Sequence, residues 1–317
     1  MTFIQGLKHR LLSGPGALAL GLVLLGAAAT ASAAPTVKFG APPWPGVTVK
    51  TKVARELLQA IGYKTSMTNA SWVIDLQSVA RGDLDADLGI WLPTQKSTVE
   101  PMVKSGKVDL LVANVPDAQY DVVVPDYVWK AGVHCICDLH KYAKKFDHKI
   151  YGIEAGNDGN EIMKKAIKNN TYSLKGWKLV PSSTAGMLSQ AGRAIRAHKW
   201  IVFLGWKPHW MNIKYHIRYL KDPKKIWGGQ STVHTAANPA FVKNNPNVAR
   251  FLKQMVVPSK IQSRWIYEFG YNKTPADQVA KTWIKNNMDT VSKWLDGVKT
   301  ADGSKPAIEA VKSAFSS

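Results

Sequence analysis

Four aromatic side chains lie at the ends of expected strands or in the loops beside them, where an α/β sheet presents its ligand-binding residues. They are Trp44, Trp91, Tyr120 and Trp206. A quaternary ammonium group has no N–H to donate, so its recognition depends on apolar contact and on the negative faces of aromatic rings. The four positions together predict an aromatic box for such a cation. For any one ring taken alone, an ordinary place in the hydrophobic core is the competing interpretation.

Trp206 belongs to the most informative stretch, residues 201–212. Ile201 to Leu204 are apolar and partly β-branched, which predicts a buried strand. Gly205 and Pro208 are expected to break that strand. Trp206 is therefore predicted just past the carboxyl end of the strand.

Polar groups for the other end of a ligand accompany the aromatics. Gly46 and Val47 begin an expected helix, where free backbone N–H groups and the helix dipole favour a carboxylate. His209 is close to Trp206 and is a candidate donor to that carboxylate, although a rim or capping role fits it equally well. The glycine-spaced loop 152–160 has no lysine at the Walker position. It is therefore interpreted as a turn that presents Asn157 to a cleft and caps the next helix.

A second constellation competes with the aromatic box. His134, Cys135, Cys137 and His140 fall within seven residues. Only one residue separates the cysteines, so a disulfide would close a tight ring, and the spacing matches no common structural zinc site. Inert or loosely paired thiols, a strained disulfide and a metal or redox site all remain open, with the thiols favoured.

The sequence contains no convincing catalytic set. The G-x-S-x-G and H-E-x-x-H motifs are absent from it. Asp83, Asp85 and Asp87 alternate with apolar residues and are interpreted as a solvated turn. A protein that is not an enzyme, and that needs no cofactor or metal, is expected.

The hydrophobic pattern alternates between strand and helix periods, which predicts an α/β fold with mainly parallel sheets. The expected strands are 36–39, 64–68, 88–91, 109–113, 120–124, 149–153, 178–180, 200–204 and 231–235. The expected helices are 47–61, 74–81, 97–104, 139–146, 160–168, 184–197, 239–242, 248–255, 261–269, 276–285 and 290–298, with a further helix or frayed end at 305–315.

Two such series, followed by a returning helical segment, predict two lobes joined by a hinge. The first lobe comprises 34–118 together with 228–317, and the second comprises 119–227. A cleft between lobes is a preferred place for a small ligand.

Residues 1–33 have the features of a cleaved signal peptide. Lys8 and Arg10 precede an uncharged apolar run, and Ala31-Ser32-Ala33 is a small-residue cleavage site. Their removal lowers the net charge from +20 to +18. The remaining lysines are dispersed and accompany no nucleic-acid-binding motif, so an exported chain with a basic surface and no nucleic-acid partner is expected.

Three segments carry a resemblance to a known family: Gly205-Trp-Lys-Pro-His-Trp-Met-Asn212, Gly152-Ile-Glu-Ala-Gly-Asn-Asp-Gly-Asn160 and Leu88-Gly-Ile-Trp-Leu-Pro93. On the basis of these three segments, the chain resembles the glycine betaine/choline substrate-binding proteins of ABC transporters. The resemblance implies a two-lobed periplasmic binding protein, type II-like. It also implies that Trp44, Trp91, Tyr120 and Trp206 form the box and that Asn157 is a polar ligand contact.

One departure from the family bears on the ligand. Choline-specific members carry an aspartate two residues after the first tryptophan, where it meets the choline hydroxyl; this chain has Gly46 there. They also tend to have proline where this chain has Trp210. Loss of the carboxylate removes a partner for a hydroxyl and a repulsion against a carboxylated ligand, which favours glycine betaine or another betaine over choline. A choline- or carnitine-binding protein of the same family is the alternative.

The resemblance also implies partners. A monomer that delivers its ligand to an inner-membrane permease and its ATPase is expected, with a role in osmoprotection or catabolic uptake. A sensor that works without a permease, and an exported metal or redox protein built on the cysteine–histidine cluster, are the alternatives.

Overall fold

The structure is a computed structural model that describes residues 36–316, which belong to one compact unit. The predicted signal peptide, 1–33, lies outside the described residues. Strands and helices alternate as expected, so the α/β class is confirmed.

The strands are β1 (Thr36–Gly40), β2 (Lys64–Thr68), β3 (Ala86–Leu92), β4 (Asp109–Pro125), β5 (Lys149–Tyr151), β6 (Lys178–Val180), β7 (Phe203–Lys207), β8 (Ile217–Tyr219) and β9 (Ser231–Ala237). The helices up to β9 are α1 (Pro45–Ala60), α2 (Trp72–Arg81), α3 (Lys96–Lys104), α4 (Asp126–Lys130), α5 (Asp158–Lys168), α6 (Thr184–Arg196) and α7 (Met211–Lys214), with 3₁₀ segments η1 (Ile136–Phe146) and η2 (Thr171–Ser173). After β9 come α8 (Pro239–Asn244), α9 (Pro246–Gln254), α10 (Ser259–Ile266), the π-helical turn η3 (Tyr267–Tyr271), α11 (Ala276–Asn286), α12 (Met288–Trp294) and α13 (Ala307–Phe315).

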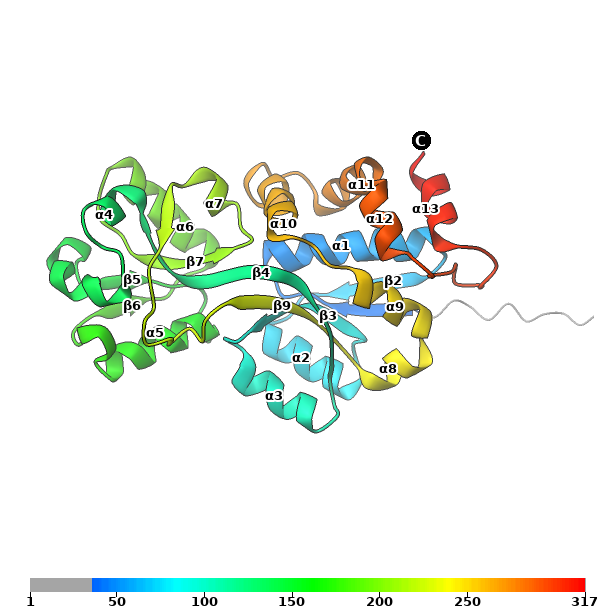
Figure 1. Cartoon of the computed structure of the whole chain (residues 1–317), viewed down its shortest axis with the longest axis horizontal. Coiled ribbons are helices and arrows are strands. Elements are labelled where there is room, and N and C mark those ends of the chain that lie inside the picture. The colour runs from blue at the N-terminus through cyan, green and yellow to red at the C-terminus, as the bar shows by residue number, and fades with distance from the viewer. Residues whose placement is uncertain (1–35, 317) are drawn as a thin grey trace, which may run out of the picture. The chain divides into compact units, whose positions relative to one another are not determined.

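The strands form one mixed sheet in the order β2-β1-β3-β9-β4-β7-β5-β6, with β8 paired to β4. Its two outer parts are parallel: β1 pairs with β2 and β3, and β5 pairs with β6 and β7. Its middle is antiparallel, because β9 pairs with both β3 and β4, and β4 pairs with β7. Figure 1 shows β4 and β9 running side by side between the two parallel parts.

The length of β4 differs from the prediction of two strands separated by an interruption at 114–118. It is one strand of 17 residues. Its register against β9 shifts three times between Leu110 and Ala118, where the pairing is irregular. Such bulges accept a residue without a ladder N–H, so Pro116 does not end the strand.

The strand that carries Trp206 also differs from the prediction. β7 begins at Phe203 and continues through Gly205 to Lys207, so Trp206 lies within the strand rather than past its end. Gly205 does not break it. A Cβ atom at Gly205 would lie 2.5 Å from a methyl carbon of Val123, so the glycine allows β7 to lie close against β4. Pro208, which has no N–H, follows the last residue of the strand.

Apolar side chains gather in two places. Those on both faces of β1–β3, drawn from residues 37–108 and 236–311, are called the first core here; those drawn from 120–227 are called the second core. The stripe Val49, Val53, Leu57 and Leu58 of α1 is fully buried in the first core, as its helical spacing predicts. In Figure 1, α1 lies on one side of these strands and α2 and α3 lie on the other.

Candidate ligand-binding site

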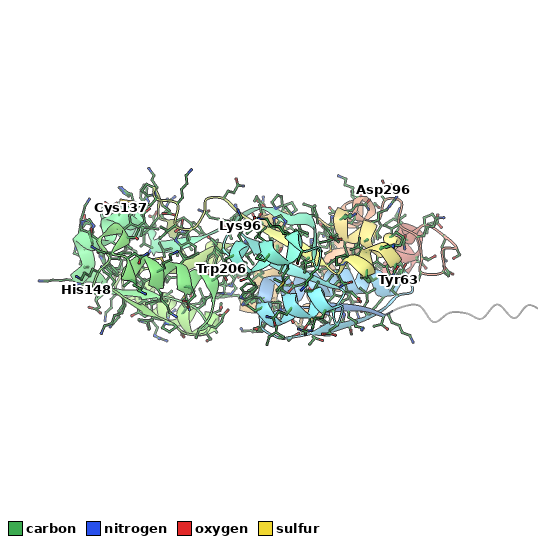
Figure 2. All side chains as sticks on the ribbon, turned by 90° about the horizontal axis from the view of Figure 1, so that it is seen from below. Tyr63, Lys96, Cys137, His148, Trp206 and Asp296 are labelled. Carbon is green, nitrogen blue, oxygen red and sulfur yellow. A yellow bond between two sulfur atoms is a disulfide. The ribbon has the colours of Figure 1, made fainter. Side chains whose placement is uncertain are left out.

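One cavity is lined by all of the residues that the sequence singled out for a ligand. They are Trp44, Gly46, Val47, Trp91, Tyr120, Asn157, Trp206 and His209. They come from α1 and β3 beside the first core, from β4, β7 and the loop after β7 beside the second core, and from the loop before α5. Figure 2 shows Trp206 between the part of the chain that carries Cys137 and His148 and the part that carries Tyr63 and Asp296.

Tyr120 is the centre of the aromatic arrangement. Its ring meets Trp91 edge to face at 5.9 Å between centroids and meets Trp206 edge to face at 5.8 Å. The contact with Trp206 follows from the register, because the two residues are direct partners across β4 and β7. Rings at steep angles to one another form walls that surround a space rather than a stack, which is the geometry a cation–π box requires.

The hydroxyl of Tyr120 has a fixed role. It donates to Asn157 Oδ1 at 3.0 Å, and the same oxygen accepts from the N–H of Gly159 at 2.9 Å, so Asn157 caps α5 as predicted. Burial, with the carboxylates of Asp158 and Glu154, raises the pKa of Tyr120 well above its usual value. The hydroxyl therefore stays protonated and keeps the ring in place.

Trp44 stands before the first turn of α1 and is held from the other side of the cavity. Its Nε1 donates to Glu154 Oε1 at 2.8 Å, and Thr184 Oγ1 is 3.4 Å from the other carboxylate oxygen. Glu154 was not among the predicted site residues, since no local pattern distinguishes it. Its carboxylate links the start of α1 to the loop after β5.

Gly46 and Val47 belong to the first turn of α1, where a helix has no backbone acceptor of its own for its N–H groups. Gln262 of α10 packs against that turn. A Cβ atom at Gly46 would lie 2.8 Å from Gln262 Nε2 and 3.2 Å from a methyl carbon of Ile266. The glycine thus leaves room for Gln262, whose buried Oε1 has no hydrogen-bond partner within residues 36–316.

His209 is only 1% exposed. Its Nδ1 lies 3.2 Å from the N–H of Met211 and accepts from it, so the ring proton belongs on Nε2. That buried Nε2 has no partner among the described residues. Burial lowers the pKa of His209 to about 3, which keeps the imidazole neutral and Nε2–H available as a donor to an anionic ligand group. The Nδ1 contact is the capping interaction that the sequence left open, and the role of Nε2–H as a ligand donor stays a prediction.

The low pKa of His209 predicts a pH effect on stability. The unfolded chain takes up this proton near pH 6.5 and the folded chain near pH 3, so acid favours unfolding between these values. In urea titrations from pH 7.5 to 4.5, His209→Gln is expected to gain on the wild type by ~1.4 kcal/mol of unfolding free energy per pH unit below 6.5. His134→Gln, which removes an exposed histidine, is the control. A wild-type–variant difference that stays constant would show that His209 titrates normally when folded.

Two further sequence interpretations change. Asp87 is fully buried, so it is not part of a solvated turn, although Asp83 is exposed. Cys135 and Cys137 form a disulfide, so the favoured interpretation as inert or loosely paired thiols is wrong and the disulfide alternative is the one observed. Neither cysteine lines the cavity. Within residues 36–316, no group of three or more histidine, cysteine or acidic side chains is placed to hold a metal ion.

Residues 35–286 match the family described as the substrate-binding domain of the ABC-type glycine betaine transport system. The chain belongs to this glycine betaine transport family. It is therefore related to solute-binding components of ABC transporters, whose solved members are two-lobed α/β proteins. No helix within residues 36–316 is both long and apolar enough to cross a membrane.

Solved structures of family members resemble the chain over most of its length. A choline-binding protein of an ABC transporter, in complex with choline, is 32% identical with a TM-score of 0.83, over 88% of this chain and 98% of that one. Lactococcal OpuAC, closed on glycine betaine, is 32% identical with a TM-score of 0.75, over 82% and 98%. The glycine betaine/carnitine transport binding protein GbuC of Listeria monocytogenes is 34% identical over 160 residues, which is 50% of this chain and 53% of GbuC.

Proposed function

We propose that this chain captures glycine betaine in the box formed by Trp44, Trp91, Tyr120 and Trp206 and delivers it to an ABC permease. The supporting observation is that four aromatic side chains, drawn from the surroundings of both cores, line one cavity together with two kinds of N–H donor. The rings suit a quaternary ammonium head and the donors suit a carboxylate. The cavity thus complements both ends of a betaine, and no bond needs to be made or broken.

The carboxylate end decides between betaine and choline. Nε2–H of His209 and the first turn of α1 offer donors, and Gly46 places no carboxylate there. A choline hydroxyl would gain less from these donors than a carboxylate, because hydrogen bonds to charged groups are the stronger ones. The solved relatives with choline and with glycine betaine make both compounds necessary probes.

The proposed mode of action is capture by closure. Lobes comprising 34–118 with 228–317, and 119–227, would be joined where the chain crosses within β4 and again just before β9, and a ligand that touches both favours the closed form. The chain would be exported after cleavage near Ala33 and act as a monomer with an inner-membrane permease and its ATPase. Asn157 would meet the ligand while it holds Tyr120.

Calorimetry and thermal unfolding of the chain from Ala34 onward test the proposal. Glycine betaine, choline, carnitine and proline are compared, since a ligand that binds only the folded state raises the melting temperature. Glycine betaine is expected to give the lowest Kd and the largest shift. Tighter binding of choline would overturn the ligand assignment, and the absence of any shift would overturn the function.

Glu154 provides a test of closure that is separate from ligand contact. Glu154→Ala removes the acceptor of Trp44 Nε1, and hydrogen bonds to charged groups contribute about 1.5 to 3 kcal/mol before compensation by water. Affinity is expected to fall roughly 5- to 30-fold for glycine betaine and choline alike, with Glu154→Gln retaining most of it. Calorimetry with both ligands measures this, and a change in their ratio would mean that Glu154 acts on the ligand itself.

A further inference from the structure

Lys50 is a fully buried lysine that lines the candidate cavity. It stands on α1 one turn beyond Gly46 and Val47, which line the same cavity. Long side chains of a helix lean toward its N-terminus, so the Lys50 side chain runs back toward the first turn. Lysine is almost never fully buried without a partner, and a buried ammonium beside a ligand cavity requires an explanation.

The partners of Lys50 hold its ammonium in one place. Nζ donates to Asn114 Oδ1. The Asn114 amide cannot turn away, because its Nδ2 donates to the carbonyl of Leu88 at 3.1 Å and to Thr235 Oγ1 at 2.9 Å. β4 therefore supplies a neutral acceptor in a fixed orientation.

The opposite charge that acts on Lys50 comes from outside the lining of the cavity. Asp87 of β3 is fully buried, accepts from the N–H of Gly89 at 2.7 Å, and does not line the cavity. Burial lowers the pKa of Lys50 to about 7, and the charge of Asp87 opposes that shift. Of these two groups, Lys50 lines the cavity and Asp87 does not.

Other titratable groups face the same region from neighbouring elements. Asp75 of α2 adds negative charge beyond Asp87, whose pKa is raised by burial and by Asp75. His234 of β9 has its pKa lowered by burial and by Lys50. His209 and Asp158 line the cavity: burial lowers the pKa of the histidine and raises that of the acid. Among the described residues, no lysine other than Lys50 lines this cavity.

We propose that Lys50 is a specificity-determining residue, whose ammonium favours a quaternary ammonium ligand that carries a carboxylate over one that carries a neutral hydroxyl. The inference rests on the proposed function and deepens it. The protonated Lys50 ammonium, held in one place in a water-poor site, attracts the carboxylate of a zwitterion and offsets the repulsion of its ammonium head. A ligand with a positive charge alone meets only the repulsion.

The same physics couples binding to a proton on Lys50. A bound carboxylate stabilises the charged lysine and raises its pKa, so a carboxylated ligand should take up protons when it binds. Choline should instead release them. As the pH rises through about 7, glycine betaine affinity should fall and choline affinity should rise.

Calorimetry with glycine betaine and choline, between pH 6 and 8.5 in buffers of different ionisation enthalpy, tests the inference. Lys50→Met keeps the length of the side chain and removes its charge. The betaine-to-choline affinity ratio is expected to fall at least 10-fold, and the opposite proton counts of the wild type should disappear. Lys52→Met is the matched control, because Lys52 lies on the same helix, is partly exposed and does not line the cavity. Its ratio should equal that of the wild type.

A second variant guards against a folding defect. Lys50→Met leaves Asp87 buried without its cation, so Lys50→Met combined with Asp87→Asn removes both charges at nearly constant volume. The double variant should melt cooperatively and show the same shift in ratio. If the betaine-to-choline affinity ratio is unchanged in this folded variant while the wild type binds both ligands, the inference about Lys50 is overturned and the proposed function stands. A wild type that binds neither ligand overturns the proposed function and this inference with it.

Discussion

Replacement of Trp206 by alanine is expected to weaken glycine betaine binding about 30-fold, a loss of ~2 kcal/mol. The ring of Trp206 lines the cavity, and its β-sheet partner Tyr120 meets it edge to face. Its removal takes away one wall of the box and admits water beside the cation. Isothermal calorimetry of the purified variant measures the effect directly.

Two further variants at Trp206 separate the contribution of cation–π attraction from that of apolar burial. Trp206→Phe keeps a π face and is expected to lose little, whereas Trp206→Leu keeps apolar area without a ring quadrupole and should resemble alanine more closely. Leucine binding as tightly as phenylalanine would show that burial, rather than cation–π attraction, holds the ligand. Full affinity in the alanine variant would remove Trp206 from the site.

Introduction of an aspartate at Gly46 is expected to reverse the ligand preference. The new carboxylate would stand in the first turn of α1, beside the donors proposed for the betaine carboxylate. Like charges placed against each other cost several kcal/mol, so glycine betaine should bind roughly 100-fold more weakly. Choline, which offers a hydroxyl to the new acceptor, should bind at least as well as it does to the wild type. Competition calorimetry with both ligands gives the ratio.

The side chains packed against Gly46 determine which control variants that experiment needs. Any Cβ there must displace the end of Gln262, so the aspartate is best combined with Gln262→Ala. Gly46→Asn in the same background has nearly the same volume and no charge. It should lower the affinities for glycine betaine and choline to a similar degree. A betaine preference that survives the aspartate would place the carboxylate away from the first turn of α1.

The candidate site was predictable where residue type alone carries the signal. Aromatic side chains near strand ends identified Trp44, Trp91, Tyr120 and Trp206, and all of them line one cavity. Their local setting was less predictable, since Gly205 is a packing glycine and not a strand breaker. Its small size matters only because Val123 of another strand lies against it.

The residues that sequence reasoning missed are polar groups whose position depends on distant partners. Lys50 looks like a surface lysine of an amphipathic helix, and its burial follows from Asn114 and Asp87, far along the chain. Glu154 is similar, because its partner Trp44 is 110 residues away. The long strand β4 was split by the polar and proline residues that its bulges accommodate. Neither the burial of a single charged side chain nor a bulge leaves a periodic pattern in a single sequence.

The pairing of Tyr120 with Trp206 has a consequence for the order of events during capture. Both rings are mounted opposite each other on hydrogen-bonded strands of one sheet, so the corner that they form does not depend on how far apart the two cores stand. Under the proposed capture by closure, a cation would settle on this corner before the Trp44–Glu154 contact forms. The Tyr120–Trp206 corner would then govern the association rate of the ligand, and the contact between Trp44 and Glu154 would govern its dissociation rate.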